Sequence, residues 1–334
     1  MVIVESYALA VSLCFITMLC WGSWANTQKL ASKEWKFQLF YWDYSIGVLL
    51  LTLIFAFTLG STGEEGRGFL EDLAVADNSS IWSALLGGII FNLANILLVA
   101  AIDIAGMAVA FPVGIGLALV IGVITNYLAT PVGDPIILFL GVAFVAVAIV
   151  IDAIAYGKLP STSDKSTSKG LILSIIAGIA MGFFYRFVAA SMATDFGNPE
   201  VGMLTPYTAL VIFACGLFLS NIVFVTAIMF KPISGEKVAA LDYFRKGNPK
   251  LHLVGIFGGI IWSIGMSLSI IASGAAGFAI SYGLGQGATM VAAFWGVFIW
   301  KEFKDAPEGT NKLLAVMFAL FFIGLILIIF SKVV

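Results

Sequence analysis

Charged residues are scarce in this sequence: Asp, Glu, Lys and Arg make up 11% of its 334 residues, whereas 61% are hydrophobic. A soluble domain carries about 25% charged residues, so a water-soluble fold is excluded. The formal net charge of −2 offers no basic surface to nucleic acid. The apolar runs are continuous and helical in length, unlike the alternating segments of a membrane β-barrel. The composition therefore predicts a helical protein that spans the lipid bilayer.

Histidine and cysteine are nearly absent, which excludes several kinds of site. His252 is the only histidine, so no multi-histidine metal site can form, and its place at the end of an apolar run predicts a solvated side chain. Cys14, Cys20 and Cys215 fall inside apolar runs and make neither a disulfide framework nor a zinc site. We expect no metal and no cofactor. An integral membrane enzyme is disfavoured because the chain shows no histidine pair and no nucleophile with a base.

The apolar runs predict an all-α polytopic membrane protein with ten transmembrane helices. Fourteen Lys and Arg residues fall in the loops after odd-numbered spans, whereas only Arg67 and Lys332 fall on the other side. Because basic residues are retained in the cytoplasm, we expect a multi-pass protein of the cell (inner) membrane with both termini outside. The predicted spans are residues 7–26, 39–59, 81–102, 105–128, 136–156, 170–192, 204–230, 251–273, 275–300 and 311–331.

The segment 87–127 returns 171 residues later without a gap, and eleven of the thirty positions from Gly87 to Gly116 are identical to their partners. This internal repeat predicts two five-helix units, residues 1–156 and 170–334, joined by a cytoplasmic linker at 157–169. Five spans per unit is an odd number, so the second unit enters the membrane from the opposite side. Such a 5+5 inverted repeat is typical of secondary transporters. The matched groups are Gly87–Ile90 with Gly258–Ile261, Ala105–Gly106 with Ala276–Gly277, and Gly114 and Gly116 with Gly285 and Gly287.

Polar and aromatic side chains inside the spans are the candidates for a substrate site, because lipid offers them no partners. Asn92 and Asn95 lie one turn apart on one face, and helix-to-helix bonding is the alternative reading for both. Arg186 lies deep in its span beside Tyr185 and needs a polar partner or the outer interface. Trp21 and Trp24 share a face near the end of the first span, followed by Asn26.

Several aromatic and acidic residues have two readings. Trp42 and Tyr44 are expected in an interfacial belt, where aromatic residues gather at span ends. Asp43 is the best candidate for a proton carrier, because burial raises the pKa of a carboxyl; the alternative is a side chain that merely reaches water. Asp152, near another cytoplasmic end, has the same two readings.

The fourth and ninth spans carry features that weaken a helix. Pro112 removes a backbone hydrogen bond, and the matching region Tyr282–Gly287 holds three glycines. Interrupted helices at matching positions of two halves indicate a transport site, whereas tight helix packing is the alternative. In that site Gln286 places an amide, while Phe111 and Tyr282 offer stacking faces; Trp262 matches Phe91 in the repeat.

Four short motifs recur in a known family of transporters. They are Val4-Glu5-Ser6, Trp21-Gly22-Ser23-Trp24, Trp42-Asp43-Tyr44, and Gly87-Gly88-Ile89 followed by Asn92 and Asn95. With these motifs and ten predicted spans, the chain resembles the drug/metabolite transporter superfamily, and within it the ureide permease group and the related glucose/ribose/rhamnose porter group. The resemblance implies proton-coupled uptake of a small neutral polar solute: a ureide or nucleobase in one group, a sugar such as ribose or glucose in the other. The short central loop lacks a phosphate-binding motif, so nucleotide binding is not implied.

These observations predict a secondary active transporter that imports a small neutral polar metabolite by alternating access, with a proton or another ion as its coupling partner. An exporter of drugs or metabolites and a passive channel are the rivals. We expect one central cavity in which aromatic faces stack on the solute and amides bond its polar edge, with Asp43 carrying the proton. The predicted substrate-binding residues are Trp21, Trp24, Asn26, Asn92, Asn95, Phe111, Tyr185, Arg186, Trp262, Tyr282 and Gln286.

Overall fold

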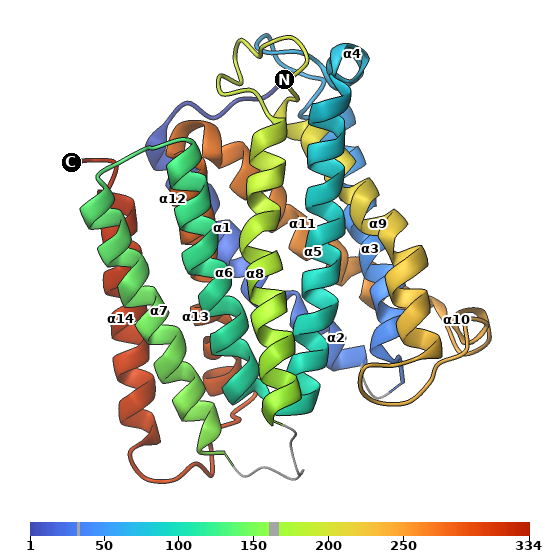
Figure 1. Ribbon diagram of the computed structural model, residues 1–334, viewed down its shortest axis with the longest axis vertical. Helices are drawn as coiled ribbons and strands as arrows, with labels where there is room; N and C mark the ends of the chain where they lie inside the picture. The colour runs from blue at the N-terminus through green and yellow to red at the C-terminus, as the bar shows by residue number, and fades with distance from the viewer. Residues whose placement is uncertain (32–33, 160–166) are drawn as a thin grey trace.

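Helices build the whole of the described structure, a computed structural model that covers residues 1–31, 34–159 and 167–334 (Figure 1). Ten of its helical stretches are long and apolar enough to cross a membrane, which confirms the predicted number of spans. The helices are α1 (Tyr7–Ser23), α2 (Ala25–Ala31), α3 (Phe37–Phe57), α4 (Phe69–Val75), α5 (Asn78–Ala105), α6 (Met107–Ala129), α7 (Pro135–Gly157), α8 (Thr167–Ser191), α9 (Pro206–Phe230), α10 (Asp242–Arg245), α11 (Pro249–Ala276), α12 (Phe278–Gly285), α13 (Ala288–Phe294), the π-helix η1 (Trp295–Ile299) and α14 (Thr310–Phe330).

The spans run up and down through one bundle, so both chain ends lie at the same end of it (Figure 1). We call this end the terminal face; it also carries α4 and the loop at 192–205. The opposite end, the basic face, carries α2, α10 and the described ones among the fourteen basic loop residues. The predicted linker at 157–169 lies at this face, although residues 160–166 fall outside the described part of the chain.

Proline and capping residues mark where several spans begin. Pro135, Pro206 and Pro249 each open a helix, where their missing N–H would have no helical partner. Asp134 and Asn248 cap α7 and α11 by accepting hydrogen bonds from backbone amides three residues on. These signals place the helix starts within two or three residues of the sequence-based spans.

The helices pack in pairs that are repeated between the two halves. Helix α5 packs on α8 and α9, and α11 packs on α1 and α3 in the matching arrangement. Helix α6 contacts α8 as α12 and α13 contact α1, while α7 packs on α14. This pattern is consistent with a two-fold relation between the halves.

Two glycines break the chain at matching places. Gly106 separates α5 from α6 with φ 82° and ψ 161°, and Gly277 separates α11 from α12 with φ 87° and ψ 148°. Residues with a Cβ avoid this region of positive φ. Because the two glycines are 171 residues apart, they keep the register of the sequence repeat.

The predicted helix interruptions are found in only one of the two matching spans. Pro112 lies within the continuous helix α6, close to its first turn, so the prediction of a break there is wrong. The ninth span does break, at Gln286 and Gly287 between α12 and α13. A further break, which the sequence did not indicate, separates α1 from α2 at Trp24.

Candidate transport site

Trp262 lies buried at the middle of the bundle and joins aromatic rings from both halves. Its ring centroid is 4.5 Å from that of Phe91, 6.0 Å from Phe213, 6.1 Å from Trp21 and 6.2 Å from Tyr44. Five different helices supply these rings, so the contact depends on the tertiary fold alone. We call these five residues the central aromatic cluster.

A second line of rings leads from this cluster toward α12. Phe91 lies 5.0 Å from Phe184, which is 6.0 Å from Tyr185, and Tyr185 is 5.0 Å from Tyr282. The fold thus connects the predicted site residues Trp21, Trp262, Tyr185 and Tyr282 through ring contacts. Trp24 joins them too, because its ring lies 4.9 Å from Tyr44.

The hydroxyls of the two tyrosines already have protein partners. Tyr185 bonds Ser269 at 3.0 Å and Ser281 at 2.8 Å. Tyr282 donates to the carbonyl oxygen of Ala118 at 3.1 Å. In this conformation these hydroxyls tie helices together, and both side chains are fully buried.

Asn92 is buried and ties α5 to α9. Its amide nitrogen lies 2.7 Å from Ser220 Oγ, 2.9 Å from Asn221 Oδ1 and 3.2 Å from the Leu217 carbonyl. Its carbonyl oxygen Oδ1 is buried without a hydrogen-bond partner among the described residues. Asn92 therefore combines helix bonding with one free acceptor inside the bundle.

The remaining predicted residues lie apart from the rings. Asn26 accepts a hydrogen bond from Trp300 Nε1 at 2.6 Å near the basic face. Arg186 is half-buried and has no hydrogen bond or ion pair within residues 1–31, 34–159 and 167–334. Gln286 is buried at the break between α12 and α13, and Phe111 is half-buried on α6. The expectation of one central cavity that unites all these side chains stays a prediction.

Asp43 is completely buried near the basic face and accepts three hydrogen bonds. Trp35 Nε1 donates from 2.8 Å, Tyr243 donates through its hydroxyl, and His252 Nδ1 lies 2.9 Å away. Burial, with the carboxylate beside it, raises the pKa of the Tyr243 phenol, which keeps this hydroxyl a donor. The expectation that His252 is merely solvated is wrong, because its ring packs on Trp35 and its nitrogen contacts a carboxylate from the other half.

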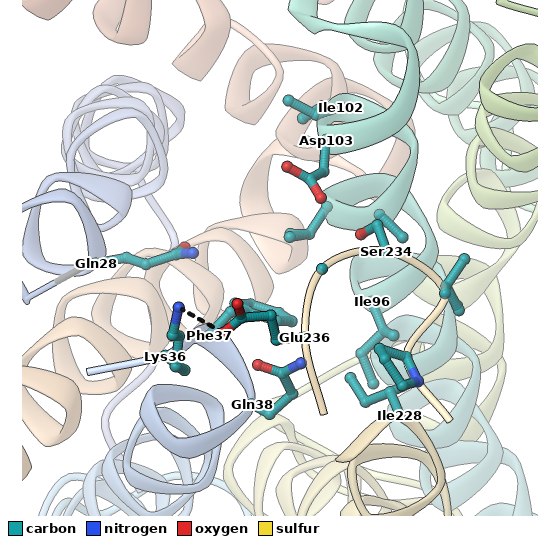
Figure 2. A pocket seen from close by; sticks show the side chains of 15 residues that line it. Gln28, Lys36, Phe37, Gln38, Ile96, Ile102, Asp103, Ile228, Ser234 and Glu236 are labelled. Atoms are coloured by element: carbon teal, nitrogen blue, oxygen red, sulfur yellow. Dashed lines mark ion pairs between the residues drawn. The ribbon is translucent and has the colours of Figure 1, made fainter. Parts of the chain in front are cut away.

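A cavity of about 330 Å³ opens near the basic face, between the start of α3, the end of α5 and the loop after α9 (Figure 2). None of the predicted substrate-binding residues lines it. Its lining combines apolar side chains with amides and charged groups: Gln28, Lys36, Phe37, Gln38, Ile96, Val99, Ala100, Ile102, Asp103, Ile228, Pro232, Ile233, Ser234, Gly235 and Glu236.

Three aromatic residues of α3, which the site prediction left out, connect this cavity to the bundle centre. Phe37 lines the cavity and lies 5.1 Å from Tyr41, which stacks on Tyr44 at 5.1 Å. Asn95 donates a hydrogen bond of 3.0 Å to the Tyr41 hydroxyl. Tyr44 is fully buried, so its assignment to an interfacial belt is wrong. The spacing i, i+4, i+7 places all three rings on one helix face and is the signal that could have revealed them.

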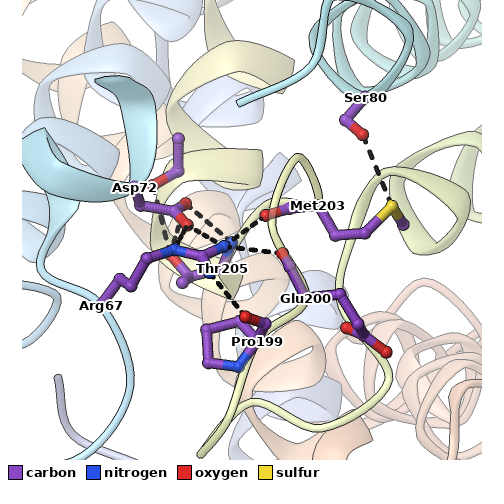
Figure 3. Close-up of polar contacts among 8 residues, drawn as sticks. Arg67, Asp72, Ser80, Pro199, Glu200, Met203 and Thr205 are labelled. Carbon is purple, nitrogen blue, oxygen red and sulfur yellow. Dashed lines mark hydrogen bonds and ion pairs between the residues drawn. The ribbon is translucent and has the colours of Figure 1, made fainter. Parts of the chain in front are cut away.

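A network around Arg67 joins the two halves at the terminal face (Figure 3). Arg67 bonds Asp72 at 2.9 and 3.0 Å and donates to the carbonyls of Pro199, Glu200 and Met203 across the interface between the halves. Asp72 is fully buried and also accepts from the backbone N–H and the hydroxyl of Thr205, at 2.8 and 3.0 Å. We call this network the Arg67 latch.

Ten apolar helices long enough to cross a membrane and a buried polar cluster that joins two halves define a multi-pass membrane protein. The sequence profile of the family described as Ureide permease matches residues 40–159 and 158–331, so the chain belongs to the ureide permease family. Ureide permease 1 of Arabidopsis thaliana is 23% identical over 394 residues, with 99% of each chain covered. Ureide permease 4 of the same plant is 22% identical over 391 residues, with 96% of each covered. A solved crystal structure shares the fold at 16% identity, with a TM-score of 0.58 over 96% of each chain.

Proposed function

We propose that this protein imports a small neutral polar solute of the ureide or nucleobase kind across the cell membrane. Membership of the ureide permease family over both halves is the observation that carries this proposal. The aromatic interior is compatible with it, because the flat amide and ureido groups of such solutes can lie against aromatic rings. The basic face would point to the cytoplasm, as the distribution of Lys and Arg predicts.

The transport cycle would use the inverted repeat, with each half related to the other across the membrane plane. One pair of contacts shows the repeat: its donors are 171 residues apart and its acceptors 169. Asn92 donates to the carbonyl of Leu217 on α9, and its partner in the repeat, Ser263, donates to the carbonyl of Val48 on α3. Because the two halves make equivalent contacts in opposite orientation, one half can rock against the other between an outward-open and an inward-open state.

The conformation described has the Arg67 latch formed at the terminal face and a cavity of about 330 Å³ at the basic face. A second hollow, lined by Met1, Ile3, Glu5, Glu64 and Glu65, lies at the terminal face. Alternating access requires that contacts such as the latch form and break in turn. Asp43 also ties the halves at the basic face through Tyr243 and His252. We therefore assign this conformation to a stage in which the halves are joined at both faces and the cavity lies at the basic face.

Asp43 is proposed as the proton-coupling group. It lies in the first half, whereas His252 and Tyr243 belong to the second, so its charge holds the halves together at the basic face. A protonated carboxyl is a poorer acceptor than a carboxylate, because charge-assisted hydrogen bonds are about twice as strong as neutral ones. Proton binding would thus loosen this contact, and proton release would restore it.

Uptake into proteoliposomes with and without an imposed proton gradient tests the proposal. Uracil and allantoin should accumulate when the gradient is present, and ribose, glucose and rhamnose should not. Asp43→Asn should abolish accumulation while leaving exchange of internal for external solute. Asp152→Asn is the matched control, because Asp152 is a second buried carboxylate in the same half. If Asp152→Asn abolishes accumulation and Asp43→Asn does not, the coupling role belongs to Asp152; if only sugars accumulate, the solute class is wrong.

A further inference from the structure

The cavity at the basic face has the size and lining of a small-ligand site. Ligand sites in proteins are clefts of about 300–1,000 Å³, so a volume of about 330 Å³ fits a solute with a single small ring. Phe37 gives it an aromatic wall, while Ile96 and Ile228 add apolar surface. It opens between elements of both halves, where a transport path must run.

Two carboxamides line this cavity. Gln28 comes from α2 and Gln38 from the first turn of α3, and Figure 2 shows both directed toward the same space. Neither side chain makes a hydrogen bond within the part of the chain that the structure describes, although both are half-buried. A carboxamide offers both a donor and an acceptor, which is the complement of an amide or ureido edge.

The charges of the lining disfavour an anion. Lys36 is paired with Glu236 at 3.8 Å, and both are exposed at the rim (Figure 2). Asp103 also lines the cavity and has no ion-pair partner among the described residues. One cation against two carboxylates repels a carboxylate or phosphate ligand and leaves a neutral solute as the fitting class.

The rings of α3 continue from this cavity to the central aromatic cluster. The contacts of Phe37 with Tyr41 and of Tyr41 with Tyr44 form a line of rings about two turns long, which ends against Trp262. The Tyr44 hydroxyl is fully buried without a hydrogen-bond partner among the described residues. A buried polar group of this kind normally has a partner, so this hydroxyl points to a ligand or a second conformation.

We propose that the cavity is the inner binding station for a planar, neutral solute with amide groups, with Phe37 as its stacking face and Gln28 and Gln38 as its hydrogen-bonding side chains. The Phe37–Tyr41–Tyr44 face of α3 is the route by which the solute passes from the bundle centre to this cavity. This inference rests on the proposed function and names the site that the imported solute occupies before release.

Equilibrium binding of radiolabelled uracil to the purified full-length protein in lipid nanodiscs tests the proposal. Base-on-aromatic stacking and a lost buried hydrogen bond are each equivalent to roughly a 5- to 150-fold change in affinity. Phe37→Leu and Gln38→Leu should each weaken uracil binding within that range. Orotate, which is uracil with an added carboxylate, should compete much less well than uracil.

Two matched variants control for general effects. Phe57→Leu removes a ring from the other end of α3, where Phe57 is exposed, and Asn311→Leu removes an exposed amide at the basic face. Both should bind uracil as the wild type does. Thermal unfolding of each variant in the absence of ligand separates a lost binding contact from a lost fold.

Thiol labelling locates the ligand independently of affinity. Ser234→Cys places a thiol in the cavity lining, and saturating uracil should slow its reaction with a small maleimide several-fold. If uracil binds but neither protects this thiol nor loses affinity in Phe37→Leu, the station lies elsewhere and this inference alone fails. If neither uracil nor allantoin binds the wild type, the proposed function fails and this inference fails with it.

Discussion

The Arg67 latch offers the sharpest test of how this transporter closes one face. Arg67 makes five contacts of 2.6–3.0 Å with Asp72 and three backbone carbonyls, and its side chain is only 14% exposed. Replacing it by methionine keeps much of its length and apolar stem but removes every one of these contacts. Asp72 would then stay buried with Thr205 as its remaining partner.

The size of the effect follows from the burial of this pair. Breaking a buried ion pair by removing one partner costs about 3–5 kcal/mol, and we take the lower end because Thr205 still donates two hydrogen bonds to Asp72. A change of about 3 kcal/mol shifts a two-state equilibrium roughly 150-fold. For a wild type in which the state closed at the terminal face is favoured about a hundredfold over the open state, Arg67→Met would therefore bring the two states to similar populations.

Labelling of a thiol beneath the latch measures this shift. Thr208 is fully buried next to Thr205, so Thr208→Cys, with the three native cysteines replaced, should react slowly with a membrane-impermeant maleimide in intact cells. Adding Arg67→Met should raise the labelling rate many-fold. Arg245→Met, which removes an exposed cation at the basic face, should leave the rate unchanged.

An unchanged labelling rate in a folded Arg67→Met protein would refute the reasoning, because the latch would then contribute nothing to closure. Arg67→Lys gives a graded version of the test. Lysine keeps the charge but not the planar fork that bonds a carboxylate and several carbonyls together. Its labelling rate should lie between those of the wild type and Arg67→Met.

Three further predictions use other parts of the molecule. Asp43→Asn should transport solute only down its gradient, and proton-driven accumulation that persists in this variant would exclude Asp43 as the coupling group. Gly88→Ala should destabilise the protein by roughly 1–3 kcal/mol in chemical denaturation, because a Cβ there would lie 2.0 Å from a backbone oxygen of α9; Gly116→Ala, with nothing within 4 Å, should be neutral. A cysteine introduced at Glu71 should react with an impermeant reagent in intact cells and one at Lys246 should not, and the reverse pattern would invert the proposed orientation.

The number of spans and the places where they start were predictable from the sequence. Hydropathy over about 20 residues and a proline at the first helical turn are local properties, so they survive whatever the helices pack against. The 171-residue register also had a structural meaning, because Gly106 and Gly277 adopt the same unusual backbone conformation at the two helix junctions.

The partners of the polar and aromatic side chains were decided by the tertiary structure alone. Asp43 and His252 are 209 positions apart, and only the packing of α3 on α11 brings them to 2.9 Å. The same packing buries Tyr44, which the sequence suggested for the membrane interface. An apolar span shows which residues do not suit lipid, whereas the neighbour that satisfies each of them depends on how distant helices rotate and cross.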